Sequence, residues 1–115
     1  MAERILQDIA EQKKRLEIAQ INKNTEEKAH AYHNLASAYY FLKDFHRAIE
    51  YFKQFLSIAE EVGDGERARC AFNKLGWAYG SLGDYQRAIE YHNQELRISK
   101  EVGNRAGEGL SLIHI

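Results

Sequence analysis

Apolar residues recur along this chain at the three- and four-residue spacing of helices that bury one face. One stripe consists of Tyr32, Leu35, Ala36, Tyr39 and Leu42. A second consists of Phe45, Ala48, Ile49, Phe52, Leu56 and Ala59. Further along, the first pattern returns as Phe72, Leu75, Gly76, Tyr79 and Leu82. The stripes predict pairs of amphipathic helices, and no proline is present to interrupt them.

Short polar breaks separate the stripes and predict where the helices end. Glycine readily adopts the left-handed conformation that ends a helix, and aspartate caps the helix that follows, so Gly83 and Asp84 form such a break. Lys43 stands in place of that glycine one unit earlier, at a cost of about 1 kcal/mol if the left-handed geometry is kept. Gly63 and Gly103 are predicted to end the second helix of each pair. The predicted helices lie near residues 2–22, 26–42, 44–62, 66–82, 84–102 and 106–113.

The pairs belong to an internal repeat of 40 residues. Residues 28–67 align without a gap on residues 68–107, and seventeen positions are identical. In the same register, residues 2–27 form the second helix of an earlier repeat plus a linker, and residues 108–115 open another repeat. Because each helix buries only one face, neighbouring repeats must stack to hide the apolar stripes. The predicted fold is all-α: a right-handed superhelix of antiparallel helix pairs.

The overall composition excludes several classes of function. Sixteen Lys and Arg residues nearly balance 17 Asp and Glu, whereas nucleic-acid binders usually carry a basic excess. No apolar run is long enough for a membrane span, and the N-terminal residues do not resemble a secretory signal. Cys70 is the only cysteine, so an internal disulfide is impossible and a reducing, cytoplasmic location is expected.

The pattern of aromatic, Leu-Gly/Ala, Tyr and Ala positions resembles the tetratricopeptide repeat. The residues that carry the resemblance are Tyr32, Leu35, Ala36, Tyr39, Ala48 and Phe52, then Phe72, Leu75, Gly76, Tyr79 and Ala88, with His92 in place of the last aromatic. The 40-residue unit and its Leu-Gly-Asp-Tyr phrasing are similar to scaffolds of the G-protein-signalling modulator type. The resemblance implies a protein–protein interaction scaffold that binds a partner peptide or helix in a concave groove lined by the first helix of each repeat. It assigns to that groove His33, Asn34, Ser37, Tyr40, Asn73, Lys74 and Trp77.

Two departures bear on the partner. The modulators often carry asparagines where this chain has Ser37 and Trp77, and the lysine–asparagine clamp of chaperone-binding repeats is matched only by Lys74 and Asn73. Trp77 is either a binding anchor or a packing residue for the next repeat. Two alternatives to peptide binding stay open: end-to-end self-association through uncapped repeats, and service as the regulatory arm of a larger protein.

No constellation of residues predicts an enzyme, a metal site or a cofactor site. His30, His33 and Cys70 share one face, but a structural zinc site takes four ligands, so we interpret them as polar groove residues. A nucleophilic Cys70 would need a base and a closed pocket, and no signature for either surrounds it.

The last six residues, 110–115, fit the repeat only partly. Their sequence Leu-Ser-Leu-Ile-His-Ile also equals the translation of a common transposase-type sequencing adapter. We therefore expect the native sequence to depart from this one near Gly109. The alternative is a true first helix of the next repeat.

Overall fold

The computed structural model describes the backbone of residues 2–114 and the side chains of residues 2–101 and 103. Over these residues the chain forms five helices and no strand. The helices are α1 (Ala2–Ile21), α2 (Thr25–Phe41), α3 (Phe45–Val62), α4 (Gly65–Ser81) and α5 (Tyr85–His114). The first four agree with the predicted ranges to within one residue at each end.

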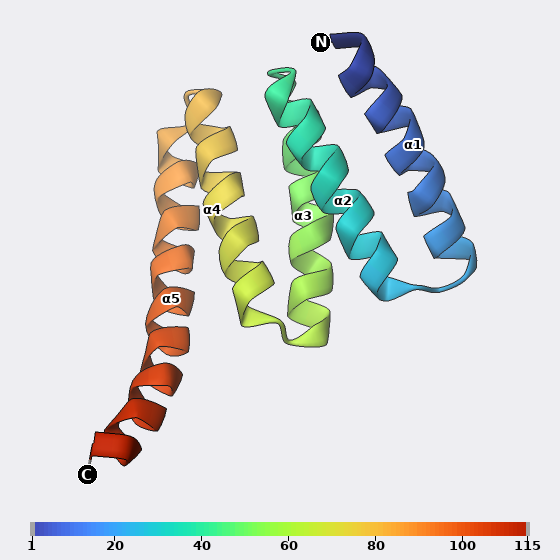
Figure 1. The fold of residues 1–115 in the computed structure, drawn as a ribbon. Coiled ribbons are helices and arrows are strands. Elements are labelled where there is room, and N and C mark those ends of the chain that lie inside the picture. Colours follow the sequence, from blue (N-terminus) through green and yellow to red (C-terminus); the bar gives the residue numbers. More distant parts are fainter. Residues whose placement is uncertain (1, 115) are drawn as a thin grey trace.

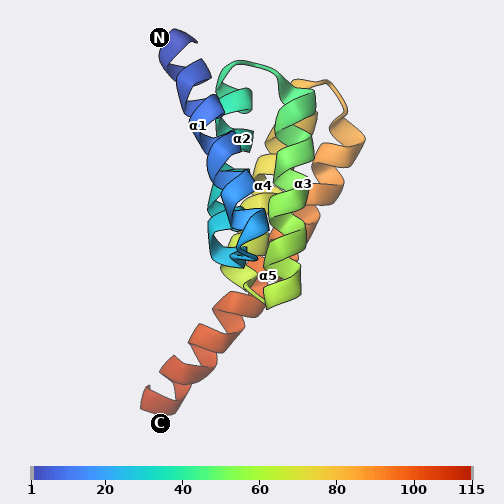
Figure 2. The ribbon, with the colours of Figure 1, turned by 90° about the vertical axis from the view of Figure 1, so that its right-hand side faces the viewer.

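Each helix packs on the next one in the chain, so the helices form a row rather than a bundle around one centre (Figure 1). The row has two layers: in Figure 2, α3 and the first turns of α5 stand to the right of α2 and α4. We call the surface formed by the first helices of the two repeats the α2–α4 face. The surface formed by their second helices is the α3–α5 face. This is the all-α helical-repeat fold that the sequence predicted.

The turns between helices repeat one backbone device every twenty residues. A left-handed residue stands at each turn, namely Lys23 (φ 55°), Lys43 (φ 64°), Gly63 (φ 71°) and Gly83 (φ 83°). The next residue is Asn or Asp, and its side chain accepts a hydrogen bond from the backbone N–H three residues on; these residues are Asn24, Asp44, Asp64 and Asp84. Lys43 therefore keeps the left-handed geometry of the glycine whose place it takes. Caps at fixed spacing explain why the helix ends could be predicted closely.

The core runs along the row, between the layers. Its most deeply buried large side chains are Leu35 and Leu75, both fully buried, and Phe52. Leu35 and Leu75 are repeat equivalents, and each sits in the middle of a first helix. Small residues such as Ala36 and Ala78 allow neighbouring helices to approach closely. No polar or charged residue is buried among those described, so apolar contact alone fills this core.

An ion pair joins the first turns of α2 and α4 and helps to fix the spacing of the α2–α4 face. The Arg67 guanidinium donates to both carboxylate oxygens of Glu26, with Nη1 at 2.9 Å from Oε2. This hydrogen bonding lowers the pKa of Glu26. Two-point contact of this kind sets orientation as well as distance.

The prediction that Gly103 ends α5 and that a separate helix spans 106–113 is wrong. Helix α5 continues through Gly103 to His114, and Figure 1 shows its last turns extending beyond the other helices. Glycine permits a left-handed turn but does not require one. At Gly63 the reversal is favoured because Asp64 caps α4, which then packs on α3. The continuing helix at Gly103 instead keeps its backbone hydrogen bonds. The expectation that residues 110–115 are a non-native tail stays a prediction, because their side chains lie outside the described ones.

Candidate functional site

A pocket of about 310 Å³ opens on the α2–α4 face. It is lined by Ser37 and Tyr40 from α2, Lys74 and Trp77 from α4, and Phe52 from α3. Phe52 is only 1% exposed and forms the floor, whereas Trp77 is 58% exposed and forms part of the rim. Four of the seven groove residues assigned from the sequence thus line one pocket.

Packing against the second helices orients the aromatic walls. The Tyr40 ring meets Phe45 edge-on, with centroids 5.3 Å apart, and the Trp77 ring meets His92 edge-on at 5.8 Å. Ser37 and Trp77 are repeat equivalents. The small Ser37 side chain on α2 leaves a space, and the large Trp77 side chain on α4 borders it. The pocket therefore exists because the two repeats carry side chains of different size at the same position.

Lys74 carries the only charge among the lining residues. It also acts on His33, which is half-buried and packs at 5.1 Å from the Phe55 ring. Burial lowers the pKa of His33, and the Lys74 charge lowers it further. His33 therefore stays neutral near pH 7 and packs beside the aromatic floor without lining the pocket.

The two asparagines assigned to the groove lie outside the pocket and are engaged with neighbouring helices. The Asn34 amide nitrogen donates to Gln12 Oε1 of α1 at 3.3 Å. The Asn73 amide nitrogen donates to both carboxylate oxygens of Glu95 on α5, at 3.1 and 3.2 Å. Of the two residues that match the lysine–asparagine clamp, Asn73 is thus hydrogen-bonded to Glu95, while Lys74 lines the pocket.

The second repeat replaces an aromatic floor with a polar cluster. His92 occupies the position of Phe52, and its Nδ1 lies 3.2 Å from Glu95 Oε1. A Cβ added to Gly76 would lie 2.6 Å from the His92 ring. The His92 ring therefore explains why this position is Gly76, whereas the first repeat has Ala36 there.

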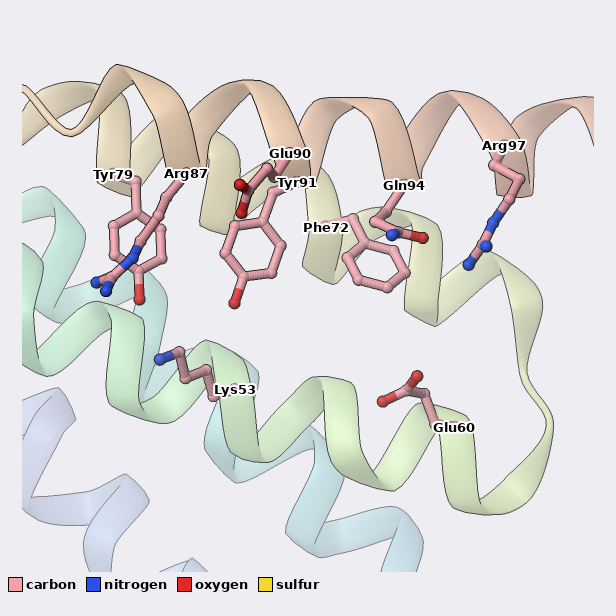
Figure 3. A pocket seen from close by; sticks show the side chains of 9 residues that line it. All are labelled: Lys53, Glu60, Phe72, Tyr79, Arg87, Glu90, Tyr91, Gln94 and Arg97. Atoms are coloured by element: carbon pink, nitrogen blue, oxygen red, sulfur yellow. The ribbon is translucent and has the colours of Figure 1, made fainter.

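A second, larger cleft of about 630 Å³ lies on the α3–α5 face (Figure 3). Its walls are α3 and α5, and Phe72 and Tyr79 of α4 form its floor. This cleft was not predicted from the sequence, because three helices contribute to it and no local motif marks it. A signal was present: Lys53, Arg87 and Tyr91 have repeat equivalents at Lys13, Arg47 and Tyr51.

Among the side chains described, no group of three or more His, Cys, Asp and Glu residues is arranged to hold a metal ion. Cys70 is a half-buried free thiol. No helix in the described part is long and apolar enough to cross a membrane.

Comparisons with known proteins bear on the fold and on the family. A sequence profile described as the tetratricopeptide repeat matches residues 9–101. The crystal structure of the TPR domain of Arabidopsis FLU superposes with a TM-score of 0.75 at 22% identity, covering 81% of this chain and 78% of that one, a likeness of fold. No curated protein matches this chain significantly. Tetratricopeptide repeats generally mediate protein–protein interaction and are a non-catalytic scaffold fold. Because the profile spans most of the sequence, this chain belongs to the tetratricopeptide-repeat family.

Proposed function

We propose that this protein binds a peptide segment of a partner protein in the pocket of the α2–α4 face. The observation that carries the proposal is Trp77, a tryptophan 58% exposed at the rim of a pocket with an aromatic floor. Tryptophan is enriched among the residues that dominate binding energy at protein interfaces. Leaving so large an apolar side chain in water has no benefit to the fold, whereas a bound side chain would cover it.

The lining residues favour a particular ligand. A volume of about 310 Å³ is at the lower end of ligand pockets, so it suits one or two side chains of a peptide. The aromatic surfaces of Tyr40, Phe52 and Trp77 favour a large apolar or aromatic side chain. Lys74 favours a carboxylate next to it. The preferred segment therefore places an acidic residue beside an aromatic or long aliphatic one.

The test is selection of a displayed random-peptide library on the whole chain, followed by affinity measurement by fluorescence anisotropy. Selected peptides are expected to pair acidic and large apolar residues, and Trp77→Ala should weaken them at least tenfold. Lys74→Met should weaken them less, and its effect should shrink at high salt. The matched control is Phe41→Ala, an aromatic residue 67% exposed on α2 outside the pocket. Equal losses in the Trp77 and Phe41 variants would contradict the proposal.

Self-association is the second candidate, and a specific surface favours it. On α5, Tyr85, Ile89 and Leu96 are 69%, 60% and 58% exposed. Stacking of this surface between copies would bury it. Sedimentation velocity over a hundredfold dilution is expected to show dissociation that Ile89→Glu shifts and Val62→Glu, at a valine 53% exposed on α3, does not. A monomer at every concentration rules this function out.

A further inference from the structure

One cluster of side chains recurs on the α3–α5 side of both repeats. The Tyr79 ring has Lys53 Nζ at 5.7 Å and Arg87 Cζ at 5.6 Å from its centre, and it stacks on Tyr91 at 5.4 Å. Forty residues earlier, Tyr39 has Lys13 at 5.8 Å, Arg47 at 5.5 Å and Tyr51 at 5.7 Å. Because both repeats keep this arrangement, cation–π contact between successive helices accounts for it as part of the fold.

Only part of the rest of the α3–α5 cleft recurs: Glu90 and Gln94 match Glu50 and Gln54, which line a similar hollow in the earlier repeat. The far end of the cleft carries Glu60 and Arg97, and Figure 3 shows them projecting from opposite walls. Their repeat equivalents are Gln20 and Ser57, both uncharged. In the earlier repeat, Gln20 Nε2 approaches the Tyr32 hydroxyl at 3.4 Å instead. The opposite charges at this end are therefore not required to build a repeat.

Glu60 and Arg97 do not form an ion pair with each other. Within the described side chains, no ion pair joins Glu60 to Arg97. Gln94 lies between the two ends of the cleft, and its Oε1 is buried without a hydrogen-bond partner among the described residues. A buried acceptor left unpaired destabilises the fold.

The near end supplies donors for an anion. Lys53 reaches from α3 toward Arg87 and Tyr91 (Figure 3). The Tyr79 hydroxyl, as a hydrogen-bond partner, raises the pKa of Lys53, so the lysine is charged. Burial raises the pKa of Tyr91, so its hydroxyl stays protonated and able to donate. An ammonium, a guanidinium and a phenol thus border one end of the cleft, where the Glu90 carboxylate also lies.

We propose that the α3–α5 cleft is a second binding site, for an extended peptide whose carboxylate lies at Lys53 and Arg87 and whose basic side chain lies at Glu60. Three cations and two carboxylates line the cleft, a balance that favours a ligand with both signs over a dianion such as phosphate. The cleft lies on the opposite layer from the Trp77 pocket, so this site is independent of the proposed function.

The spacing of the two ends sets the peptide motif. Glu60 lies seven residues beyond Lys53 on α3, which is roughly 10 Å at the helical rise per residue. An extended chain covers that distance in about three residues. The carboxylate and the basic residue should therefore be about three positions apart, in one of the two chain directions.

The experiment is an NMR titration of the ¹⁵N-labelled whole chain with four peptides. Acetyl-Ser-Glu-Ala-Ser-Lys-Ser amide and its reverse, acetyl-Ser-Lys-Ala-Ser-Glu-Ser amide, test the two directions. Acetyl-Ser-Lys-Ala-Ser-Ser with a free terminal carboxylate tests the terminus as the source of the anion. Acetyl-Ser-Gln-Ala-Ser-Gln-Ser amide lacks both charges. At least one charged peptide is expected to shift the amides of Lys53, Arg87 and Gln94, and the uncharged one is not.

The variants decide whether those shifts report the proposed site. Lys53→Met should weaken binding about tenfold and Lys53→Arg should retain it, while Lys14→Met, on the exposed surface of α1, is the matched control. Glu60→Gln should weaken the peptide that carries lysine but leave unchanged a version in which that lysine is glutamine, a selectivity that a merely structural role would not produce. No shift with any charged peptide, shifts centred on Trp77, or an equal response to inorganic phosphate alone would overturn the proposal. Circular dichroism of each variant verifies that it is folded.

Discussion

Helices α3 and α5 share the sequence Ala-Ile-Glu-Tyr but meet different surroundings. In α3, Ile49 is 6% exposed, because the helix lies between α2 and α4. In α5, Ile89 is 60% exposed, because the described part of the chain places α4 against only one side of that helix. The same residue is thus core in one repeat and surface in the next. In a solenoid, whether a residue is buried depends on the neighbouring helix as much as on the residue itself.

The largest expected effect tests that difference directly. Ile49→Ala should lower the free energy of unfolding by about 2–5 kcal/mol, since it leaves a cavity between packed helices. Ile89→Ala should lower it by less than about 0.5 kcal/mol, as for an ordinary surface change. Urea denaturation followed by circular dichroism measures both. Similar losses would mean that the α5 surface is covered in solution, by a second copy or by other means.

A smaller effect is expected at the turns, where the two repeats differ in one residue. Lys43 and Gly83 occupy the same left-handed position, with φ of 64° and 83°. Lys43→Gly should raise the free energy of unfolding by up to about 1 kcal/mol, because glycine bears no side-chain penalty there. Gly83→Lys should lower it by a similar amount. The midpoint of urea unfolding reports each change, and shifts in the opposite directions would contradict this account.

The smallest effect is a pH dependence that arises at His33 of the first repeat. Burial lowers the pKa of His33 from its usual 6.5, so the unfolded chain binds a proton there more readily than the folded one. Stability from this group is therefore complete above pH 6.5 and is lost as the pH falls toward the folded pKa. His33→Asn, which installs the residue found at position 73, should reduce the loss of stability between pH 7.5 and 5.5. Urea midpoints at the two pH values, compared between wild type and variant, provide the measurement.

The site could be predicted only in part, for a physical reason. Ser37, Tyr40, Lys74 and Trp77 were assigned to a groove because the resemblance to the tetratricopeptide repeat places the first helix of each repeat there, and these four line one pocket. The engagement of Asn34 with Gln12 and of Asn73 with Glu95 was not foreseen, since each bond joins residues 22 positions apart on different helices. Phe52 was assigned to the core stripe, and it is core, but its ring also forms the pocket floor.

The sequence by itself determined the helices, their turns and the repeat, because apolar periodicity, caps and left-handed positions are local properties. It also determined the order in which helices pack, since each unit must cover the apolar stripe of the one before. Tertiary structure alone decided the course of α5 beyond Gly103, the exposure of Ile89, and the two clefts. These features depend on which helix lies beside another in space. The identity of a glycine, an isoleucine or a lysine does not specify which residues will pack against it.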